Sequence, residues 1–557
     1  NLGMAASGKL YFEASAIIIT LISLGKLLEA RARRSTQSAI RELMALRPDT
    51  ATVWRGEAWQ SVAIDEVLRG DRLRVLVGER VPVDGKILSG ESELDESILT
   101  GESLPVPRAQ GDAVLGGAIN RSGVLEIEAT TVGEDSSLSK IIALVERAQM
   151  GKAPLQQLVD RVSAIFVPVV MAIALFTLLA WYAYSNDFGQ ALLAAVAVLV
   201  IACPCALGLA TPAAIVTGTG VAARHGILIK DVDTLQKAHA IKALIFDKTG
   251  TLTQGRPVLA SWSGTDEQLR LAAALQQASE HPLALAMREA VGKEVVLPQP
   301  EAVEVRVGAG ILGQVAGHSV AIGNPSLLAQ LGIEPPPQDE SPADGATRVW
   351  VAIDGVAVAI AALADTLRPE SPEAIATLRQ RGIASWLVSG DAPAPVAHIA
   401  AKLGLDGAFD SVLPAGKVEK VEALRAQTRG LVAMVGDGVN DAPALAAADV
   451  GIAMGSGSDV AMETASITLM RSDPRLVADA IDISAATWRT IQQNLFWAFV
   501  FNIIGIPLAA LGYLSPELAG AAMALSSITV LSNSLLLKRW QPRAGSQRQS
   551  ESKRSHP

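Results

Sequence analysis

The residues best suited to chemistry in this sequence follow short apolar runs. Residues 247–251, Asp-Lys-Thr-Gly-Thr, come directly after the apolar run Ala243–Phe246. A carboxylate at the carboxyl end of a strand, with a lysine and hydroxyls beside it, suits attack on a phosphoryl group and formation of an acyl phosphate. Asp437 and Asp441 follow another apolar run, and their carboxylates could hold Mg²⁺ near Asp247.

A third apolar run and a lysine complete this group. Ser389, Gly390 and Asp391 follow Ala384–Val388, where the serine hydroxyl could bind phosphate oxygens. Lys417 could neutralise the charge that develops during transfer. Any one of these residues alone is more often a turn or a helix cap. Together, in this order, they indicate phosphoryl transfer.

A second group of reactive side chains lies in an apolar segment. Cys203 and Cys205 flank Pro204 and are the two cysteines of the chain, too few for a disulfide framework. Proline donates no backbone hydrogen bond and clashes with the carbonyl of Val200, so we expect the helix to break there. Two thiols at such a break suit Cu(I) or Zn(II). The alternative is that they are small buried apolar side chains.

The composition indicates how these groups are held. The 557 residues are 50% hydrophobic and 18% charged, with a mean hydropathy of +0.33, which argues against wholly soluble, wholly intramembrane and disordered proteins. Helices of about 20 apolar residues cross a bilayer. Four segments satisfy this length, and a weaker fifth, Leu10–Leu28, could instead be a buried core helix; the four are Val162–Tyr184, Ala191–Gly208, Ile491–Leu514 and Leu518–Leu537.

Charge predicts the orientation of these spans. Lys and Arg follow the first, third and fifth spans and are absent from the connectors 185–190 and 515–517, which places the start of the chain outside and its tail inside. The odd number of spans and the missing initiator Met predict an N-terminally truncated chain. The net charge is −9 and the basic residues form no long run before the tail, so nucleic acid is not expected as a partner.

The organisation that follows is multidomain. Short apolar runs separated by Gly, Pro and Asp predict β-structure in the first large cytoplasmic segment, and strand–helix units predict an α/β fold in the second. The expected segments are a span (1–34), a β-rich domain (35–150), two spans (151–225), an α/β domain in two parts (226–255 and 366–488) around an inserted α+β lobe (256–365), two spans (489–540) and a disordered tail (541–557). Within the lobe, the runs 302–307, 313–322 and 349–353 are each expected to be a strand.

The chain resembles the P-type ATPases. Three of its segments look like the signatures of that family: residues 247–253, 100–103 (Thr-Gly-Glu-Ser) and 436–441. The resemblance implies an actuator domain and a haloacid dehalogenase-like phosphorylation domain with an inserted nucleotide-binding domain. Asp247 would be the nucleophile, and Asp247, Thr249 and Asp437 would hold Mg²⁺. A membrane-tethered phosphatase, the alternative, would carry a second Asp where this chain has Thr249. The resemblance therefore implies a lasting aspartyl phosphate, with Glu102 orienting the attacking water.

The inserted lobe carries a further likeness. Residues 279–282, Ser-Glu-His-Pro, are similar to the nucleotide-site motif of heavy-metal-transporting P-type ATPases. The likeness implies that ATP is bound by a set of lobe residues: Glu280, His281, Gly308, Gly310 and Asn324. The chain departs from these relatives at Gln276, where they often place Glu. Residues 308–313 also fit G-x-G-x-x-G, but no strand–helix unit with a following acid supports a dinucleotide site.

The last two spans bear on the transported metal. Met523, Ser526 and Ser527 share a helix face, and this pattern resembles the copper-transporting subgroup. That subgroup implies a Cu(I) site made by Cys203, Cys205, Asn502, Met523 and Ser527. Phe501 stands where copper pumps usually have Tyr, so Ag(I) tolerance is also expected. A zinc or cadmium pump, the alternative, would carry an intramembrane acid in these spans.

Three acids at the borders of the spans match family positions for metal movement. Glu29 and Asp160 would lie where metal enters, and Glu13 where it leaves, although border acids also simply solvate helix ends. The sequence thus predicts ATP-driven export of Cu(I) through an aspartyl phosphate. The expected partners are the lipid bilayer, the metal ion and a copper chaperone or periplasmic acceptor.

Overall fold

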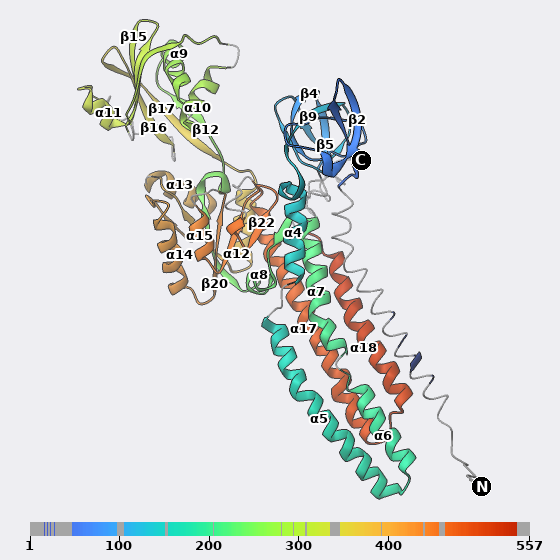
Figure 1. The fold of residues 1–557 in the computed structure, drawn as a ribbon. Coiled ribbons are helices and arrows are strands. Elements are labelled where there is room, and N and C mark those ends of the chain that lie inside the picture. Colours follow the sequence, from blue (N-terminus) through green and yellow to red (C-terminus); the bar gives the residue numbers. More distant parts are fainter. Residues whose placement is uncertain are drawn as a thin grey trace, which may run out of the picture. The chain divides into compact units, whose positions relative to one another are not determined.

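The computed structural model describes most of the chain. The described residues are 16, 19, 20, 23, 27, 47–96, 105–150, 154–203, 205–279, 281–292, 295–306, 309–334, 346–391, 393–437, 441–455 and 463–542. They form two compact units, one of residues 1–240, 466–470 and 479–557 and the other of residues 241–465 and 471–478. The first unit contains the long helices and the β-rich domain (Figure 1).

Long apolar helices dominate the first unit. Four stretches of the described residues are long and apolar enough to cross a membrane: Arg161–Ser185, Phe188–Arg224, Arg475–Ala510 and Pro516–Arg539. They correspond to the four stronger spans predicted from the sequence, whereas Leu10–Leu28 lies almost wholly outside the described residues. Large apolar side chains such as Phe176 (72% exposed) and Ile503 (67%) point away from the protein, as expected for contact with lipid.

The helices of this region have the following bounds: α5 Pro154–Ser185, α6 Phe188–Ile201, α7 Cys205–Arg224, α17 Arg475–Ala510 and α18 Pro516–Leu536. The predicted break at Pro204 is present, because α6 ends at Ile201 and α7 begins at Cys205. Beyond α7, strand β10 (Ile227–Ile229) pairs antiparallel with β22 (Ile467–Leu469), and helix α8 spans Val232–Ala238.

The segment predicted to be β-rich forms two sheets. The larger has the order β2-β1-β3-β9-β4-β7 and the smaller the order β6-β5-β8. Alternating residues such as Val53, Leu73 and Ile127 fill the core between them. The segment also contains α4 (Ser137–Met150), a helix that the strand pattern did not predict. The strands are β1 Thr50–Arg55, β2 Ala58–Ala63, β3 Arg72–Val75, β4 Asp84–Ser89, β5 Ser92–Asp95, β6 Val106–Arg108, β7 Ala113–Val114, β8 Ile119–Asn120 and β9 Leu125–Thr131.

The second unit is built on a parallel sheet with the neighbours β21-β20-β11-β18-β19. The three apolar runs predicted as strands are its centre, β11, β18 and β20, and they are buried on both faces as parallel strands require. The bounds are β11 Ile241–Asp247, α12 Ser371–Gln380, β18 Ala384–Val388, α13 Pro393–Leu403, β19 Gly407–Phe409, α14 Gly416–Gln427, β20 Leu431–Gly436, α15 Ala442–Ala447 and β21 Val450–Ala453.

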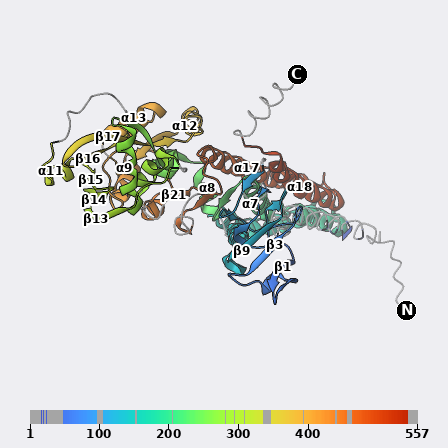
Figure 2. The ribbon, with the colours of Figure 1, turned by 90° about the horizontal axis from the view of Figure 1, so that it is seen from above.

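The inserted lobe is an antiparallel sheet in the order β12-β17-β16-β15-β14-β13, accompanied by helices α9, α10 and α11 (Figure 2). One expectation was wrong: the run 313–322, read as one strand, is a hairpin. Ala316 (φ 50°) and Gly317 (φ 85°) both adopt left-handed conformations, which closes a two-residue turn between β14 and β15. The bounds are β12 Thr253–Trp262, α9 Asp266–Leu275, α10 Pro282–Val291, β13 Pro300–Arg306, β14 Gly310–Val315, β15 His318–Gly323, α11 Pro325–Gln330, β16 Thr347–Ile353 and β17 Val356–Leu367.

Candidate phosphoryl-transfer and metal sites

The predicted phosphoryl-transfer residues meet at one edge of the parallel sheet. Asp247 is the last residue of β11, opposite Val388 of β18, so Ser389 follows at the same edge. β20, on the other side of β11, ends at Gly436 and presents Asp437 there. Since parallel strands point the same way, residues distant in sequence converge at their carboxyl ends.

Lys417, near the start of α14, joins two of the carboxylates. Its Nζ donates to Asp247 Oδ1 and to Asp441 Oδ1, both at 2.6 Å, and all three side chains are buried. Lys248 makes an ion pair with Asp391, the residue two after Ser389. The Ser389 hydroxyl is itself buried and accepts from the Asp391 backbone N–H at 3.2 Å. The site therefore contains two lysines, each paired with carboxylates from another segment.

The electrostatics of the site reflect crowding of negative charge. Burial, followed by repulsion from Asp441, raises the pKa of Asp247 to about 7. Burial and the same neighbour raise the pKa of Asp437 to about 6. Burial lowers the pKa of Lys417, but its carboxylate partners outweigh that effect, and the net shift is upward. The protein alone thus holds more carboxylate than its lysine neutralises.

This carboxylate set fits a magnesium ion. Oxygen atoms of Asp247, Asp437 and Asp441 lie within 4.8 Å of one another, and hard divalent cations prefer such ligands. The loop after β11, Lys248–Leu252, leaves space for these carboxylates, because a Cβ on Gly250 (φ 74°) would lie 1.6 Å from Asp437 Oδ2. Asp441, which the sequence suggested with Asp437 as a possible Mg²⁺ ligand, is a member of this carboxylate group. Thr249 lies exposed in the same loop.

The sequence did not predict the residues that hold this loop. Arg368 donates to the Gly250 carbonyl at 2.8 Å, and the Ser371 hydroxyl donates to the Leu252 carbonyl at 2.8 Å. The Thr253 hydroxyl contacts the Lys248 carbonyl at 2.9 Å and Asp365 Oδ2 at 2.5 Å. Asp365 and Arg368 come from the end of β17 and the residues after it, which reach the loop because β17 pairs with β12. Their only sequence signal is their position at a strand end.

The lobe residues matched to a nucleotide site mostly have local structural contacts. His281 Nδ1 accepts from the Leu283 N–H at 3.2 Å and caps α10, with its ring exposed. Asn324 caps α11 and donates its backbone N–H to the Ala309 carbonyl at 2.9 Å, beside Gly310. A Cβ on Gly310 would lie 2.2 Å from the Ile322 carbonyl, so this glycine permits close strand approach. Glu280 and Gly308 lie outside the described residues.

The helix break in the membrane region borders a small cavity of about 10 Å³, roughly the space for one small occupant. Cys203 comes from the break, Asn502 from α17 and Met523 from α18, so three predicted ligands share this cavity. Ser526 supplies its hydroxyl; Ser527, the serine predicted as ligand, is buried but does not line it. The cavity is completed by Ile201, Ala206, Ala498 and Phe501. The side chain of Cys205 lies outside the part described.

Asn502 is fixed by its own helix, since Nδ2 donates to the Ala498 carbonyl at 3.1 Å. The lining offers sulfur, amide and hydroxyl groups but no Asp, Glu, Lys, Arg or His. Such neutral, partly soft ligands favour a soft monovalent ion over a hard divalent one.

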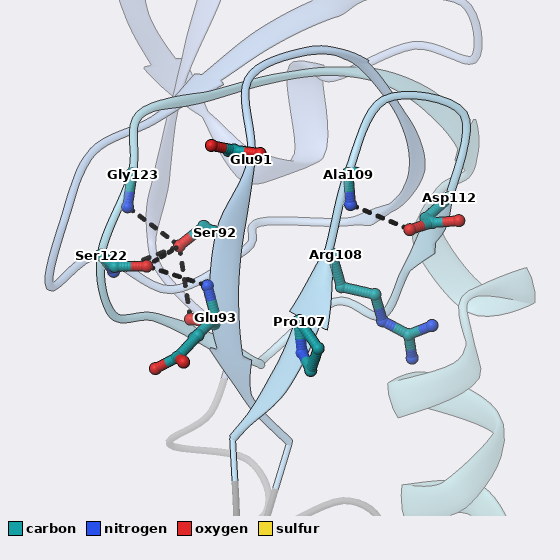
Figure 3. A pocket seen from close by; sticks show the side chains of 9 residues that line it. All are labelled: Glu91, Ser92, Glu93, Pro107, Arg108, Ala109, Asp112, Ser122 and Gly123. Atoms are coloured by element: carbon teal, nitrogen blue, oxygen red, sulfur yellow. Dashed lines mark hydrogen bonds between the residues drawn. The ribbon is translucent and has the colours of Figure 1, made fainter.

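Other predicted positions are only partly covered. Glu102 belongs to the segment between β5 and β6, and Glu13 and Glu29 to the N-terminal segment; all three lie outside the described residues. Asp160 lies in α5, but its side chain is not described. Beside β5 and β6 is an open hollow of about 510 Å³ (Figure 3). It is lined by Glu91, Ser92, Glu93, Pro107, Arg108, Ala109, Asp112, Ser122 and Gly123.

Comparisons with known proteins agree with this geometry. Residues 241–449 match the haloacid dehalogenase-like hydrolases, and residues 45–146 match the P-type ATPase actuator domain. Together with four membrane-length helices among the described residues, these two domains define a P-type ATPase. A crystal structure of a zinc-transporting PIB-type ATPase in the E2.Pi state is similar at a TM-score of 0.61 and 37% identity, covering 94% of this chain and 87% of that one.

Relatives identified by sequence show which group of P-type ATPases the chain resembles. Over 542 residues the chain is 46% identical to a copper-exporting P-type ATPase of Bacillus subtilis, covering 95% of this chain and 68% of that protein. It is 47% identical over 540 residues to a probable copper-importing P-type ATPase A of Enterococcus hirae, covering 96% and 74% respectively. The chain belongs to the copper-transporting P-type ATPase family.

Proposed function

We propose that this protein uses ATP to export Cu(I) across a bacterial inner membrane, through a phosphorylated Asp247. The observation that carries the metal assignment is the cavity at the helix break, which gathers Cys203, Asn502 and Met523 without any charged side chain. Thiol and thioether groups bind Cu(I) in preference to harder ions. Cys205, the second thiol of the motif, belongs to the proposed ligand set. Ser526, which lines the cavity, takes the place in that set that the sequence assigned to Ser527.

The chemical step follows from the carboxylate site. A carboxylate oxygen of Asp247 attacks the γ-phosphorus of ATP, the bond to the β-phosphate oxygen breaks, and ADP leaves. Lys417, 2.6 Å from Asp247, counters the negative charge of the transferring group, and Ser389 and Gly390 face its oxygens from the neighbouring strand end. Mg²⁺, held by Asp247, Thr249 and Asp437, would neutralise phosphate charge. Asp391 keeps Lys248 in place beside the nucleophile.

The remaining assignments complete the cycle. ATP would bind in the lobe 256–365 through Glu280, His281, Gly308, Gly310 and Asn324. Glu102 would orient the water that hydrolyses the aspartyl phosphate. Glu29 and Asp160 would receive Cu(I), delivered by a copper chaperone, and Glu13 would release it. These roles rest on the match between this sequence and the motifs of its family.

A zinc or cadmium pump is the rival within the family, and one solved relative transports zinc. The segments 491–514 and 518–537 contain no Asp, Glu, Lys, Arg or His to balance a divalent charge. This absence supports Cu(I) as the transported ion. Ag(I) is proposed as a second soft substrate, because Phe501 stands where copper pumps usually have Tyr. Import is a rival for direction, because one relative carries that description.

The test is metal-stimulated ATP hydrolysis by the purified protein in proteoliposomes. We expect stimulation by Cu(I) and Ag(I), and ATP-dependent uptake into inside-out vesicles. Stimulation by Zn(II) but not Cu(I) would overturn the metal assignment. ATP-dependent release of Cu(I) from preloaded inside-out vesicles would instead reverse the direction.

A further inference from the structure

A second polar contact joins the three helices that supply the cavity. Asn494 of α17 donates from Nδ2 to the Ala210 carbonyl of α7 at 2.9 Å and to Ser534 Oγ of α18 at 2.8 Å. Its Oδ1 accepts from Asn533 Nδ2 at 2.9 Å. Asn494 and Ser534 are fully buried. We name Asn494, Asn533, Ser534 and the Ala210 carbonyl the polar junction.

The polar junction repeats the arrangement of the cavity about two helical turns away. Asn494 and Asn502 are eight residues apart on α17, and Ser534 and Ser526 are eight apart on α18. Ala210 of α7 follows Cys203, which lies in the break before α7, by seven residues. At 1.5 Å per residue, a spacing of eight residues corresponds to about 12 Å along α17 and α18.

A buried apolar cluster lies between the two levels. Ala206 and Ala210 of α7, Ala498 of α17 and Val530 of α18 belong to one buried cluster. Apolar contacts are not directional, so this layer specifies the register of the helices less strictly than hydrogen bonds do. Hydrogen bonds with fixed geometry, as in the polar junction, restrict such movement.

The helix break explains why α7 needs hydrogen bonds that restrict its movement. Because α7 is separated from α6 at Pro204, its position is not set by continuation of the preceding helix. A hydrogen bond from Asn494 to the α7 backbone supplies an anchor from the helix that also carries Asn502. The bond from Asn494 to Ser534 extends the same anchor to α18 and Met523.

We propose that Asn494 is a positioning residue for transport: it fixes the register of α7, α17 and α18 so that Cys203, Asn502 and Met523 meet around the ion. The inference rests on the proposed Cu(I) transport. A second ion-binding station fits the junction less well, since the Asn494 amide is already engaged through both its nitrogen and its oxygen. Its oxygen and nitrogen groups also lack the softness that Cu(I) prefers.

The test compares three variants of the full protein: Asn494→Leu, which removes the amide at similar volume, Ser534→Ala and Ser534→Thr. The matched control is Thr529→Ala, which removes a hydroxyl that bonds the Leu525 carbonyl within α18. Each protein is assayed for the Cu(I) concentration that half-saturates ATPase activity, for maximal rate and for phosphorylation by inorganic phosphate without metal.

We expect Asn494→Leu and Ser534→Ala to raise the half-saturating Cu(I) concentration about three- to twentyfold, the range of interhelical hydrogen bonds in membranes. Maximal rate and phosphorylation by phosphate should change less than twofold. Ser534→Thr, which keeps the hydroxyl, should restore the wild-type value, and the control should not differ from it. In the double variant Asn494→Leu/Ser534→Ala, the rise in half-saturating Cu(I) concentration should be smaller than the two single effects combined. Both single variants already lose the same hydrogen bond between Asn494 and Ser534.

Two results would overturn the proposal while wild-type protein remains stimulated by Cu(I). One is unchanged half-saturation in both variants. The other is parallel loss of phosphorylation by phosphate in both variants, which would make the polar junction a folding element. Absence of Cu(I) stimulation in the wild-type protein would instead contradict the proposed function, so the two failures are distinguishable.

Discussion

The carboxylate site of the parallel sheet and the cavity at the helix break differ in the charge and the chemical type of the groups that they offer to a cation. Around Asp247, three carboxylates and a buried lysine gather from three segments. Burial, followed by repulsion from Asp441, raises the pKa values of Asp247 and Asp437. Around Cys203, every described lining side chain is neutral. The first site is built from hard oxygen ligands and the second from softer ones, so each selects a different metal.

Their supports differ in the same way. The loop Lys248–Leu252 after β11 is held by charged and hydroxyl groups, including those of Arg368, Thr253 and Asp365. The cavity is held by a backbone break and by neutral interhelical contacts such as the polar junction. Charge in the aqueous domain is tolerated because its partners compensate it, whereas an unpaired charge in the membrane is costly.

Lys417→Ala should nearly abolish phosphorylation by ATP. The substitution removes the cation that contacts Asp247 and Asp441, and losing one such electrostatic contact costs about 10²–10³-fold in rate. Phosphoenzyme formation from labelled ATP measures the effect. Lys402→Ala, on the exposed side of α13, is the control and should behave as wild type. Normal labelling of Lys417→Ala would remove this residue from the chemistry.

Gly250→Ala should lower the apparent Mg²⁺ affinity strongly, because the new Cβ would occupy the place of Asp437 Oδ2. We expect about a tenfold or larger rise in the Mg²⁺ needed for half-maximal phosphorylation, since Asp437 must move. Gly355→Ala is matched to it, with a similar positive φ (78°) but no atom within 4 Å of the Cβ. Equal effects of both variants would attribute the loss to backbone strain alone.

Met523→Leu should weaken Cu(I) stimulation about tenfold while leaving phosphorylation by inorganic phosphate unchanged. Leucine conserves most of the volume but removes the thioether that favours a soft ion. Titration of ATPase activity with Cu(I) provides the measurement. Leu525→Met, on an exposed position of the same helix, is the control and should have no effect. Unchanged half-saturation in Met523→Leu would exclude the thioether from the ligand set.

Ser526→Ala should raise the half-saturating Cu(I) concentration about threefold, and Ser527→Ala should not change it, because only the former hydroxyl lines the cavity. The same titration compares the two variants. The reverse order of effects would return the ligand role to Ser527, as the sequence predicted.

These sites differ in how far the sequence predicts them. Asp247, Ser389 and Asp437 were predictable because each follows an apolar strand, and parallel strands bring their ends together. Thr253 and Asp365 were not, because their contact depends on pairing between strands 112 residues apart. Such pairing leaves no local pattern.

In the membrane, Pro204 predicted the break between α6 and α7, but not which serine faces the cavity. Positions i+3 and i+4 share one helix face, and only packing against α17 and the break separates Ser526 from Ser527. The hairpin at Ala316 was missed for a related reason. Its turn requires a positive φ at Ala316, a residue type that rarely adopts one, so the Asn-Gly or Asp-Gly pair typical of such turns is missing.

In the proposed mechanism, phosphorylation of Asp247 by ATP requires Cu(I) bound in the cavity at the helix break. The most direct measurement is acyl-phosphate labelling of Cys203→Ser, Asp247→Asn and wild-type protein, with ATP plus Cu(I) and with inorganic phosphate without metal. We predict that wild type labels under both conditions, Asp247→Asn under neither, and Cys203→Ser with inorganic phosphate alone. Full labelling of Cys203→Ser by ATP plus Cu(I) would contradict the account.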